Sequence, residues 1–136
     1  MSDHQPDPTF RGPDAPITTY MADDIITVGP DESLRRAAEV ISEASIGCIV
    51  VGSAAAVEGV LSERDVVRAI AEGRDPDTTT VADVESTRLV WATTDATIGS
   101  VAEEMMEDYV RHVLVGDDGT VAGIVSMRDV ITAYLS

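Results

Sequence analysis

Two short stretches of the chain, 64 positions apart, carry the residue types best suited to hold a ligand. Both read Gly, two apolar residues, Ser, a variable residue, Arg and Asp, at residues 59–65 and again at residues 123–129. A strand that runs into a helix N-terminus presents backbone amides and a hydroxyl, which suit an anion or a ribose. The carboxylates of Asp65 and Asp129 could accept both ribose hydroxyls, as acidic residues do in dinucleotide folds.

The same stretches also have a structural interpretation. Ser-x-x-Asp before an apolar helix is a capping box, in which the Ser oxygen accepts from a helical amide and the Asp side chain reaches back. Capping requires neither the Gly nor the Arg, and Gly59 and Gly123 would let a ligand approach the backbone. Both interpretations stay open. The candidate ligand-binding residues of the two stretches are Ser62, Arg64, Asp65, Ser126, Arg128 and Asp129.

These stretches belong to an internal duplication. Aligned without a gap, residues 17–72 and 81–136 carry the same residue at thirteen positions. Two copies are too few for an open solenoid, so we expect them to pack on each other as a closed pair. The expected organisation is a flexible, proline-rich tail over residues 1–15, a first repeat over 16–73, a linker over 74–80 and a second repeat over 81–136.

Each copy opens with the same two patterns. Short β-rich runs lie at residues 24–28 and 88–92. Apolar residues then recur at the spacing of an amphipathic helix, beginning at Leu34 in the first copy and at Ile98 in the second. The sequence therefore predicts a strand followed by a helix at the start of each repeat.

The second part of each copy predicts a hairpin and a closing helix. Asp31 and Asp95 stand just before the amphipathic helices and are the expected N-caps. A buried strand follows each helix, and Asp-Asp-Gly at residues 117–119 signals a tight turn into a second strand. Helices are expected to begin at Ser62 and Ser126. The predicted fold class is α/β (α+β), with two β-α-β-β-α repeats packed as a pseudo-twofold pair.

The charge balance limits the partners. The chain has 25 Asp and Glu residues, nine Arg and no Lys, for a formal net charge of −16. Binding to nucleic acid or to an anionic membrane surface is therefore not expected. The 44% of hydrophobic residues, at regular intervals, indicates a folded domain. This acidic, lysine-free composition resembles that of proteins from salt-accumulating halophilic archaea.

Few residues are suited to metal binding or redox chemistry. Cys48 is the single cysteine, and His4 lies far from His112, so neither a disulfide nor a zinc site is predicted. No apolar stretch approaches the roughly 18 residues of a membrane span, and the first residues show no signal-peptide pattern. We expect a cytoplasmic protein.

Taken together, the motifs resemble a tandem pair of CBS (cystathionine beta-synthase) domains, the arrangement called a Bateman module. The resemblance covers residues 17–136 and rests on the duplicated stretch, on TVGPDESLRRAAEVI (27–41) and on VRHVLVGDDGTVAGIVSMRDV (110–130). The chain departs from the family pattern at Val50 and Leu114, where a proline is usual. It also has ADVEST at the start of the second repeat, where the family often has xDVMT.

The resemblance implies a regulatory module with two related clefts between the halves. Adenosine-containing ligands such as AMP, ADP, ATP or S-adenosylmethionine would bind there, with no cofactor required. By position, Ser62 and Asp65 in one repeat, and Ser126 and Asp129 in the other, would hold ribose and phosphate. Further lining residues would be Ile46, Gly47, Cys48, Val110, Arg111, His112, Ile17, Tyr20, Met21, Ala22, Val81, Val84 and Ser86. Related modules commonly form flat homodimers through helices such as those expected to begin at Leu34 and Ile98. An unidentified regulated protein is a further possible partner.

The two clefts are expected to differ. Arg111 and His112 occupy the positions that Gly47 and Cys48 hold in the first repeat. In related modules these positions reach the ligand held by the other half. Arg can hold a phosphate through two parallel hydrogen bonds, and His adds a donor whose charge depends on pH. A phosphate-bearing nucleotide should therefore prefer the Ser-x-x-Asp of the first repeat, unless Arg111 pairs instead with a surface acid such as Glu107.

Three classes of function remain open. The leading hypothesis is a non-enzymatic sensor that binds an adenosyl ligand. The second is a dimerisation module with empty clefts. The third is a hydrolase or transferase acting on nucleotides, for which the sequence offers no nucleophile and base pair, no Gly-rich phosphate loop and no metal cluster.

Overall fold

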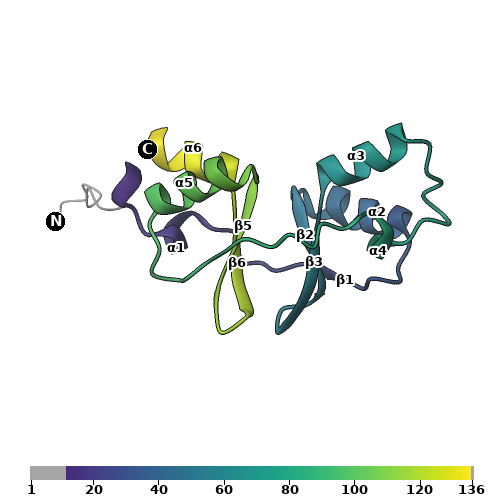
Figure 1. The fold of residues 1–136 in the computed structure, drawn as a ribbon, viewed down its shortest axis with the longest axis horizontal. Helices are drawn as coiled ribbons and strands as arrows, with labels where there is room; N and C mark the ends of the chain where they lie inside the picture. The colour runs from purple at the N-terminus through teal and green to yellow at the C-terminus, as the bar shows by residue number, and fades with distance from the viewer. Residues whose placement is uncertain (1–11, 136) are drawn as a thin grey trace. The chain divides into compact units, whose positions relative to one another are not determined.

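The computed structural model describes residues 12–135, which form two compact units built from discontinuous segments. Unit 1 contains residues 12–23, Val90–Asp117 and residues 122–135, and unit 2 contains Asp24–Leu89 and Asp118–Val121. Each unit combines helices with a three-stranded sheet (Figure 1), which confirms the predicted α/β class. Residues 1–11 of the expected tail lie outside the described residues.

The sheet of unit 2 has the strand order β1-β2-β3. β1 (Thr27–Val28) runs parallel to β2 (Cys48–Ser53), which pairs antiparallel with β3 (Ala56–Ser62). The helices of this unit are α2 (Leu34–Ala44), α3 (Glu63–Ala71) and α4 (Val81–Val84). The predicted helix starting at Leu34 is confirmed, and the first strand is shorter than the run at residues 24–28 from which it was predicted.

The sheet of unit 1 repeats this arrangement in the order β4-β5-β6. The tip of its β5–β6 hairpin, residues 118–121, is assigned to unit 2. Its strands are β4 (Trp91–Ala92), parallel to β5 (His112–Asp117), and β6 (Thr120–Ser126). Its helices are η2 (Gly12–Asp14), α1 (Ile17–Tyr20), α5 (Ile98–Asp108) and α6 (Met127–Leu135). Helix α5 confirms the start predicted at Ile98, and α5 and α6 lie side by side (Figure 1).

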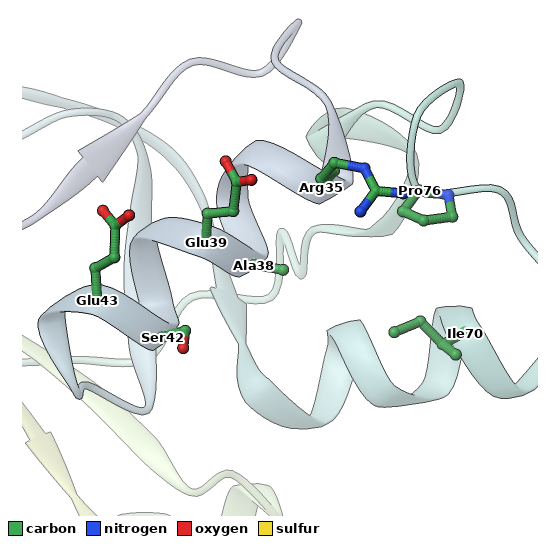
Figure 2. Close-up of a pocket in the computed structure, with 7 residues that line it drawn as sticks. All are labelled: Arg35, Ala38, Glu39, Ser42, Glu43, Ile70 and Pro76. Atoms are coloured by element: carbon green, nitrogen blue, oxygen red, sulfur yellow. The ribbon is translucent and has the colours of Figure 1, made fainter.

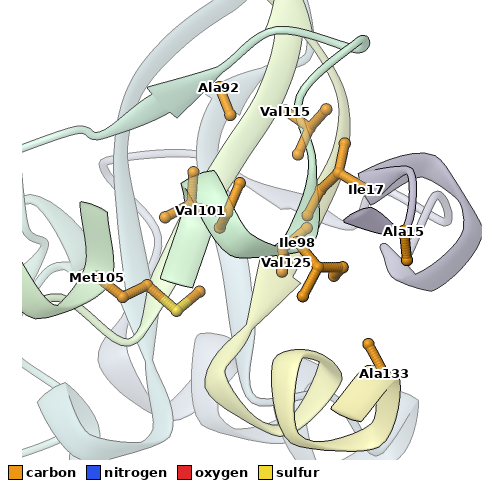
Figure 3. Close-up of a cluster of buried hydrophobic side chains, with 10 residues drawn as sticks. Ala15, Ile17, Ala92, Ile98, Val101, Met105, Val115, Val125 and Ala133 are labelled. Atoms are coloured by element: carbon orange, nitrogen blue, oxygen red, sulfur yellow. The ribbon is translucent and has the colours of Figure 1, made fainter. Parts of the chain in front are cut away.

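The first residues of each sequence repeat lie in the unit that contains most of the other repeat. α1 precedes the strands of the first repeat in sequence but belongs to unit 1, and α4 opens the second repeat but belongs to unit 2. Ile17 of α1 and Val81 of α4 are fully buried in the cores of these units. Figure 3 shows Ile17 among the core side chains of unit 1, beside Val115 and Ile98. The two short helices were not predicted.

The last residues of the expected tail are ordered. Residues 12–15 include the η2 turn, and Ala15 is fully buried. The carbonyl of Ala15 accepts the amide of Ile98 at 2.9 Å, so this segment supplies a hydrogen bond to the first turn of α5. The tail predicted over residues 1–15 therefore does not include residues 12–15.

The predicted N-caps of α2 and α5 were wrong by two residues. Ser33, not Asp31, caps α2, and its Oγ accepts the amide of Arg36 at 3.1 Å. Thr97, not Asp95, caps α5. An N-cap must directly precede the first helical residue with an extended backbone, and only Ser33 and Thr97 meet that requirement.

The expected linker satisfies the remaining amides at the start of α2. The amides of Leu34 and Arg35 donate to the carbonyls of Thr79 at 2.8 Å and Pro76 at 3.0 Å. The Arg35 guanidinium also pairs with Asp77, with Nη2 to Oδ2 at 3.0 Å. Hydrogen bonding to Arg35 lowers the pKa of the exposed Asp77 carboxyl. Residues 74–80 are thus a structural part of unit 2.

The hairpins use different turns in the two units. Asp118 and Gly119 both have positive φ, 55° and 79°, as a two-residue type I′ turn requires, which confirms the turn predicted from Asp-Asp-Gly. In unit 2 the pairing of β2 with β3 instead has an irregularity at Gly52, with φ of 106°, and a side chain there would collide with the carbonyl of Ala56.

No helix among the described residues is long and apolar enough to span a membrane.

Candidate ligand site

The duplicated Ser-x-Arg-Asp stretches connect a strand to a helix in both units. We call the β3–α3 connection of unit 2 the first junction and the β6–α6 connection of unit 1 the second junction. At the first, Ser62 Oγ accepts the amide of Asp65 at 3.2 Å, and Asp65 Oδ2 accepts the amide and hydroxyl of Ser62, each at 2.9 Å. At the second, Asp129 Oδ2 accepts the amide of Ser126 at 2.8 Å and Ser126 Oγ accepts the amide of Asp129 at 3.2 Å. The capping interpretation is confirmed in both copies.

Capping leaves part of each carboxylate available. A carboxylate has about four acceptor positions, and the box uses those of one oxygen. The second oxygen of Asp65 lies 3.5 Å from Nη1 of Arg68, and the Asp65 side chain keeps 14% of its surface exposed. Arg64 and Arg128 are exposed in the first turns of α3 and α6. The junction can therefore accept further hydrogen bonds without losing its cap.

A second segment is held against each junction by a repeated helix ending. Ser45 and Tyr109, the C-caps of α2 and α5, have left-handed backbones with φ of 55° and 56°, which turn the chain sharply. The following residues, Ile46 and Val110, donate their amides back to carbonyls of the last helical turn at 3.3 and 3.1 Å. These turns direct the chain toward the N-termini of α3 and α6.

Those turns end in one hydrogen bond at each junction. The carbonyl of Gly47 accepts the amide of Glu63, the first residue of α3, at 2.9 Å. The carbonyl of Arg111 accepts the amide of Met127, the first residue of α6, also at 2.9 Å. The predicted residues Ile46, Gly47 and Cys48 therefore lie beside the first junction. Val110, Arg111 and His112 lie beside the second.

A third segment pairs with the strand that leads into each junction. Val60 and Ser86 exchange two backbone hydrogen bonds, of 2.9 and 2.8 Å, in unit 2. Ala22 and Ile124 exchange two of the same lengths in unit 1. Val84 and Ser86 are thereby brought to the first junction. Tyr20, Met21 and Ala22 are brought to the second.

The repeated glycines make room for this third segment. A β-carbon at Gly59 would lie 2.8 Å from the carbonyl oxygen of Ser86, and one at Gly123 would lie 3.0 Å from that of Ala22. The first separation is shorter than real carbon–oxygen contacts, and the second is tighter than nearly all of them. The expectation that these glycines admit a ligand is corrected: the space beside each is filled by the chain itself.

Three of the predicted lining residues have core side chains. Ile17 and Val81 are fully buried, and Cys48 is 7% exposed. These side chains fix the positions of their segments. Burial, with a smaller contribution from the nearby charge of Asp65, raises the pKa of the Cys48 thiol to about 12, so the thiol stays protonated and unreactive at neutral pH.

The charged residue predicted to distinguish the clefts is accessible. Arg111 is exposed and His112 is half-buried at the second junction.

No group of three or more His, Cys, Asp or Glu residues within residues 12–135 is arranged to hold a metal ion.

A surface hollow of about 380 Å³ lies away from both junctions. It is in unit 2, between α2 and α3, with Glu39 and Glu43 of α2 on one side and Ile70 of α3 on the other (Figure 2). Two carboxylates at its rim would repel a phosphate, and the arginine that lines it, Arg35, is already paired with Asp77. This hollow is therefore a poor nucleotide site.

Comparison with protein-family profiles matches residues 17–72 and residues 81–136 each to the CBS domain. The chain belongs to the CBS domain family. The two CBS domains form a tandem pair, and each strand-to-helix junction falls inside one matched repeat.

Relatives of known sequence and structure share this architecture. The CBS domain-containing protein YhcV from Bacillus subtilis is 28% identical over 121 residues, which are 88% of this chain and 86% of YhcV. The CBS-domain containing protein ATU1752 from Agrobacterium tumefaciens is 35% identical with a TM-score of 0.75, covering 82% of this chain and 84% of that one. The CBS domain pair of protein MJ0100, solved with 5'-methylthioadenosine and S-adenosyl-L-methionine, has a TM-score of 0.77 at 21% identity, covering 86% of this chain and 97% of that one.

Replacing Gly59 by Ala should separate the third segment of the CBS pair from β3. The added methyl group has no space beside the Ser86 carbonyl, so we expect a loss of roughly 1–3 kcal/mol in unfolding free energy. Gly29→Ala is the matched control, because a β-carbon there meets only Glu32, at 3.4 Å. Urea unfolding measures both variants. Equal stability of Gly59→Ala and wild type would contradict the assignment.

Proposed function

We propose that this CBS pair is a non-catalytic regulatory module that binds an adenosine-containing ligand at its strand-to-helix junctions. The observation that carries the proposal is the duplicated convergence of three chain segments on a capped helix N-terminus. Tandem CBS modules are in general regulatory and ligand-binding. The likeness to the MJ0100 pair, whose structure contains two adenosyl compounds, supports the same ligand class here.

The ribose and the anionic part of such a ligand each find a suitable group at a junction. The partly exposed carboxylates of Asp65 and Asp129 suit the ribose hydroxyls, since a carboxylate accepts several hydrogen bonds at once. The N-termini of α3 and α6, with Arg64 and Arg128 in their first turns, suit a phosphate or carboxylate. On a chain of net charge −16, these local positive groups decide where an anion binds.

Titration calorimetry with AMP, ATP, S-adenosylmethionine and adenosine tests this function directly. The measurements belong in both dilute buffer and molar salt, because the acidic surface repels anions more strongly without screening. Saturable binding without turnover supports a sensor. Formation of a product from ATP and magnesium would instead indicate an enzyme, and absence of binding by all four compounds would leave only a dimerisation module.

Replacing Asp65 by Ala should weaken binding as well as lower stability. Loss of the cap costs about 0.5–2 kcal/mol in unfolding free energy, and loss of the ribose acceptor should lower affinity for adenosine and AMP alike, by about tenfold. Thr97→Ala is the control, since it breaks a capping box of α5 away from the junctions. Calorimetry and thermal unfolding measure both. If Asp65→Ala is destabilised like Thr97→Ala but binds normally, Asp65 is only a cap.

Arg111 should contribute to phosphate binding. The Arg111→Ala variant is expected to bind AMP about tenfold more weakly and adenosine with unchanged affinity, because adenosine lacks the phosphate. Arg36→Ala serves as the control: it removes one exposed arginine from α2, where that side chain pairs with Glu39 at 3.8 Å. Calorimetry decides, and an equal loss for both ligands, or none for AMP, would remove this role.

Helices α3 and α6 support self-association of the module. Val67 and Ile70 of α3 are 64% and 57% exposed, and Ile131 and Tyr134, at the equivalent positions of α6, are 54% and 52% exposed. Duplicated apolar faces are typical of surfaces that a partner covers. A second copy is the proposed partner, in a homodimer with an isologous interface.

The oligomeric state tests this interface. Light scattering should give twice the 14.4 kDa mass of the chain for wild type, and the single mass for the variant Ile70→Glu, Tyr134→Glu. Thr18→Glu, which adds a charge to the exposed surface of α1, should stay dimeric. A wild-type monomer at micromolar concentration in high salt would overturn the proposal.

A further inference from the structure

A carboxylic acid occupies the space beside Gly59. Glu85 directly follows α4, and its amide donates to the carbonyl of Val81 at 2.9 Å. Its neighbour Ser86 is bonded to Val60 through both backbone groups. The backbone of Glu85 is thus held on both sides, and its side chain lies over Gly59, where an added β-carbon would be 2.1 Å from Oε1.

The Glu85 carboxyl is held in conditions that favour its protonated form. Its Oε1 atom is buried and has no hydrogen-bond partner among the described residues. The carboxyl group is hydrogen-bonded to that of Glu58 on β3, and two carboxyls can share such a bond only if one of them carries a proton. Burial, followed by the hydrogen bond and the charge of Glu58, raises the pKa of Glu85 to about 7.

Three charged side chains on the neighbouring helices have other partners. Asp83 of α4 accepts the amide of Thr80 at 3.2 Å. Asp65 and Arg68 of α3 face each other at 3.5 Å. Within the described residues, Glu58 is the charged group that acts on the Glu85 carboxyl.

The acid pair of unit 2 has an apolar counterpart in unit 1. The internal alignment places Met21 opposite Glu85 and Ala122 opposite Glu58. Met21 lies over Gly123 as Glu85 lies over Gly59, with its Sδ 2.4 Å from the position of an added β-carbon. An apolar side chain therefore fills the space beside the glycine as well as a glutamate does. Packing alone does not explain why unit 2 has an acid at this position.

We propose that Glu58 and Glu85 form a proton-operated latch. With one proton in the pair, the Glu85–Ser86 segment lies paired on β3, and loss of that proton loosens the segment. Because Val84 and Ser86 reach the first junction on this segment, the latch also regulates ligand binding there as pH changes. That last consequence rests on the proposed function, whereas the latch itself does not.

The direction of the pH effect follows from linkage. The pKa of Glu85 is about 7 in the folded protein against an ordinary value of 4.5, so the folded state binds the proton more tightly than the unfolded state. The stability that the pair contributes is therefore fully present below the ordinary value and is lost as the pH rises through about 7. Two adjacent ionised carboxylates, one with a buried oxygen that no donor reaches, account for the loss.

Denaturant unfolding at several pH values and constant salt tests the latch. Between about pH 5 and pH 8, the folding equilibrium constant of wild type should fall roughly a hundredfold more than that of Glu85→Gln. Glu58→Gln should also flatten the profile. Glu103→Gln, which removes an exposed charge from α5, should follow wild type. Parallel profiles for wild type and Glu85→Gln would overturn the proposal.

Measurements on the wild-type protein alone test the latch even if a variant fails to fold. Carbon-13 NMR of the Glu85 carboxyl should give a titration midpoint near 7, and a midpoint near the ordinary 4.5 would overturn the latch. Over the same pH range, the amides of Val60 and Ser86 should lose protection from hydrogen exchange relative to those of Ala22 and Ile124. The latter pair has the same hydrogen bonds without the acids.

Discussion

The pairing of two backbones beside a glycine is the contact on which the rest of each unit depends. Val60 and Ser86 exchange both hydrogen bonds, and the absence of a side chain at Gly59 lets the Ser86 carbonyl come close. The paired segment is anchored by Val81 of α4, which is fully buried in the core. Without this approach, neither the short helix nor the residues that follow it would reach the strand-to-helix junction, and the same holds at Gly123 in unit 1.

The hydrogen bonds that stabilise the junctions would also order them for the proposed ligand. Ser62 and Asp65 hold each other through the cap, so the carboxylate is ordered before any ligand arrives. Asp129 is ordered in the same way by Ser126. An ordered acceptor loses little entropy on binding, which favours affinity. Capping and ligand binding are therefore compatible uses of the same residues, and the proposed function needs both.

Much of the fold was predictable because it is set by local patterns. The apolar spacing after Leu34 and the Ser-x-x-Asp pattern at Ser62 each depend on residues within a few positions of one another. The exchange of α1 and α4 was not predictable, since the burial of Ile17 depends on strands about 75 or more residues away. The capping box of α4, in which Asp83 accepts the amide of Thr80, was a usable local signal that went unnoticed.

The candidate site was predicted by residue type better than by role. Gly59 was expected to face a ligand, but in the structure it makes room for the segment at Glu85 and Ser86. The sequence does not show that this segment lies beside it. Glu85 was not singled out, although the sequence ADVEST departs from the family pattern at that residue. Its raised pKa arises from burial and from Glu58, and both exist only in the folded unit because Glu58 is distant in sequence.

The central claim is that three chain segments at one junction form a single adenosyl site. Amide chemical-shift mapping on the full chain during titration with AMP tests it most directly. The account predicts coincident, saturable shifts of Gly47, Ser62 and Ser86, or of their counterparts Arg111, Ser126 and Ala22, with one dissociation constant for each set. Shifts confined to the hollow between α2 and α3, or separate constants for the segments of one junction, would contradict it.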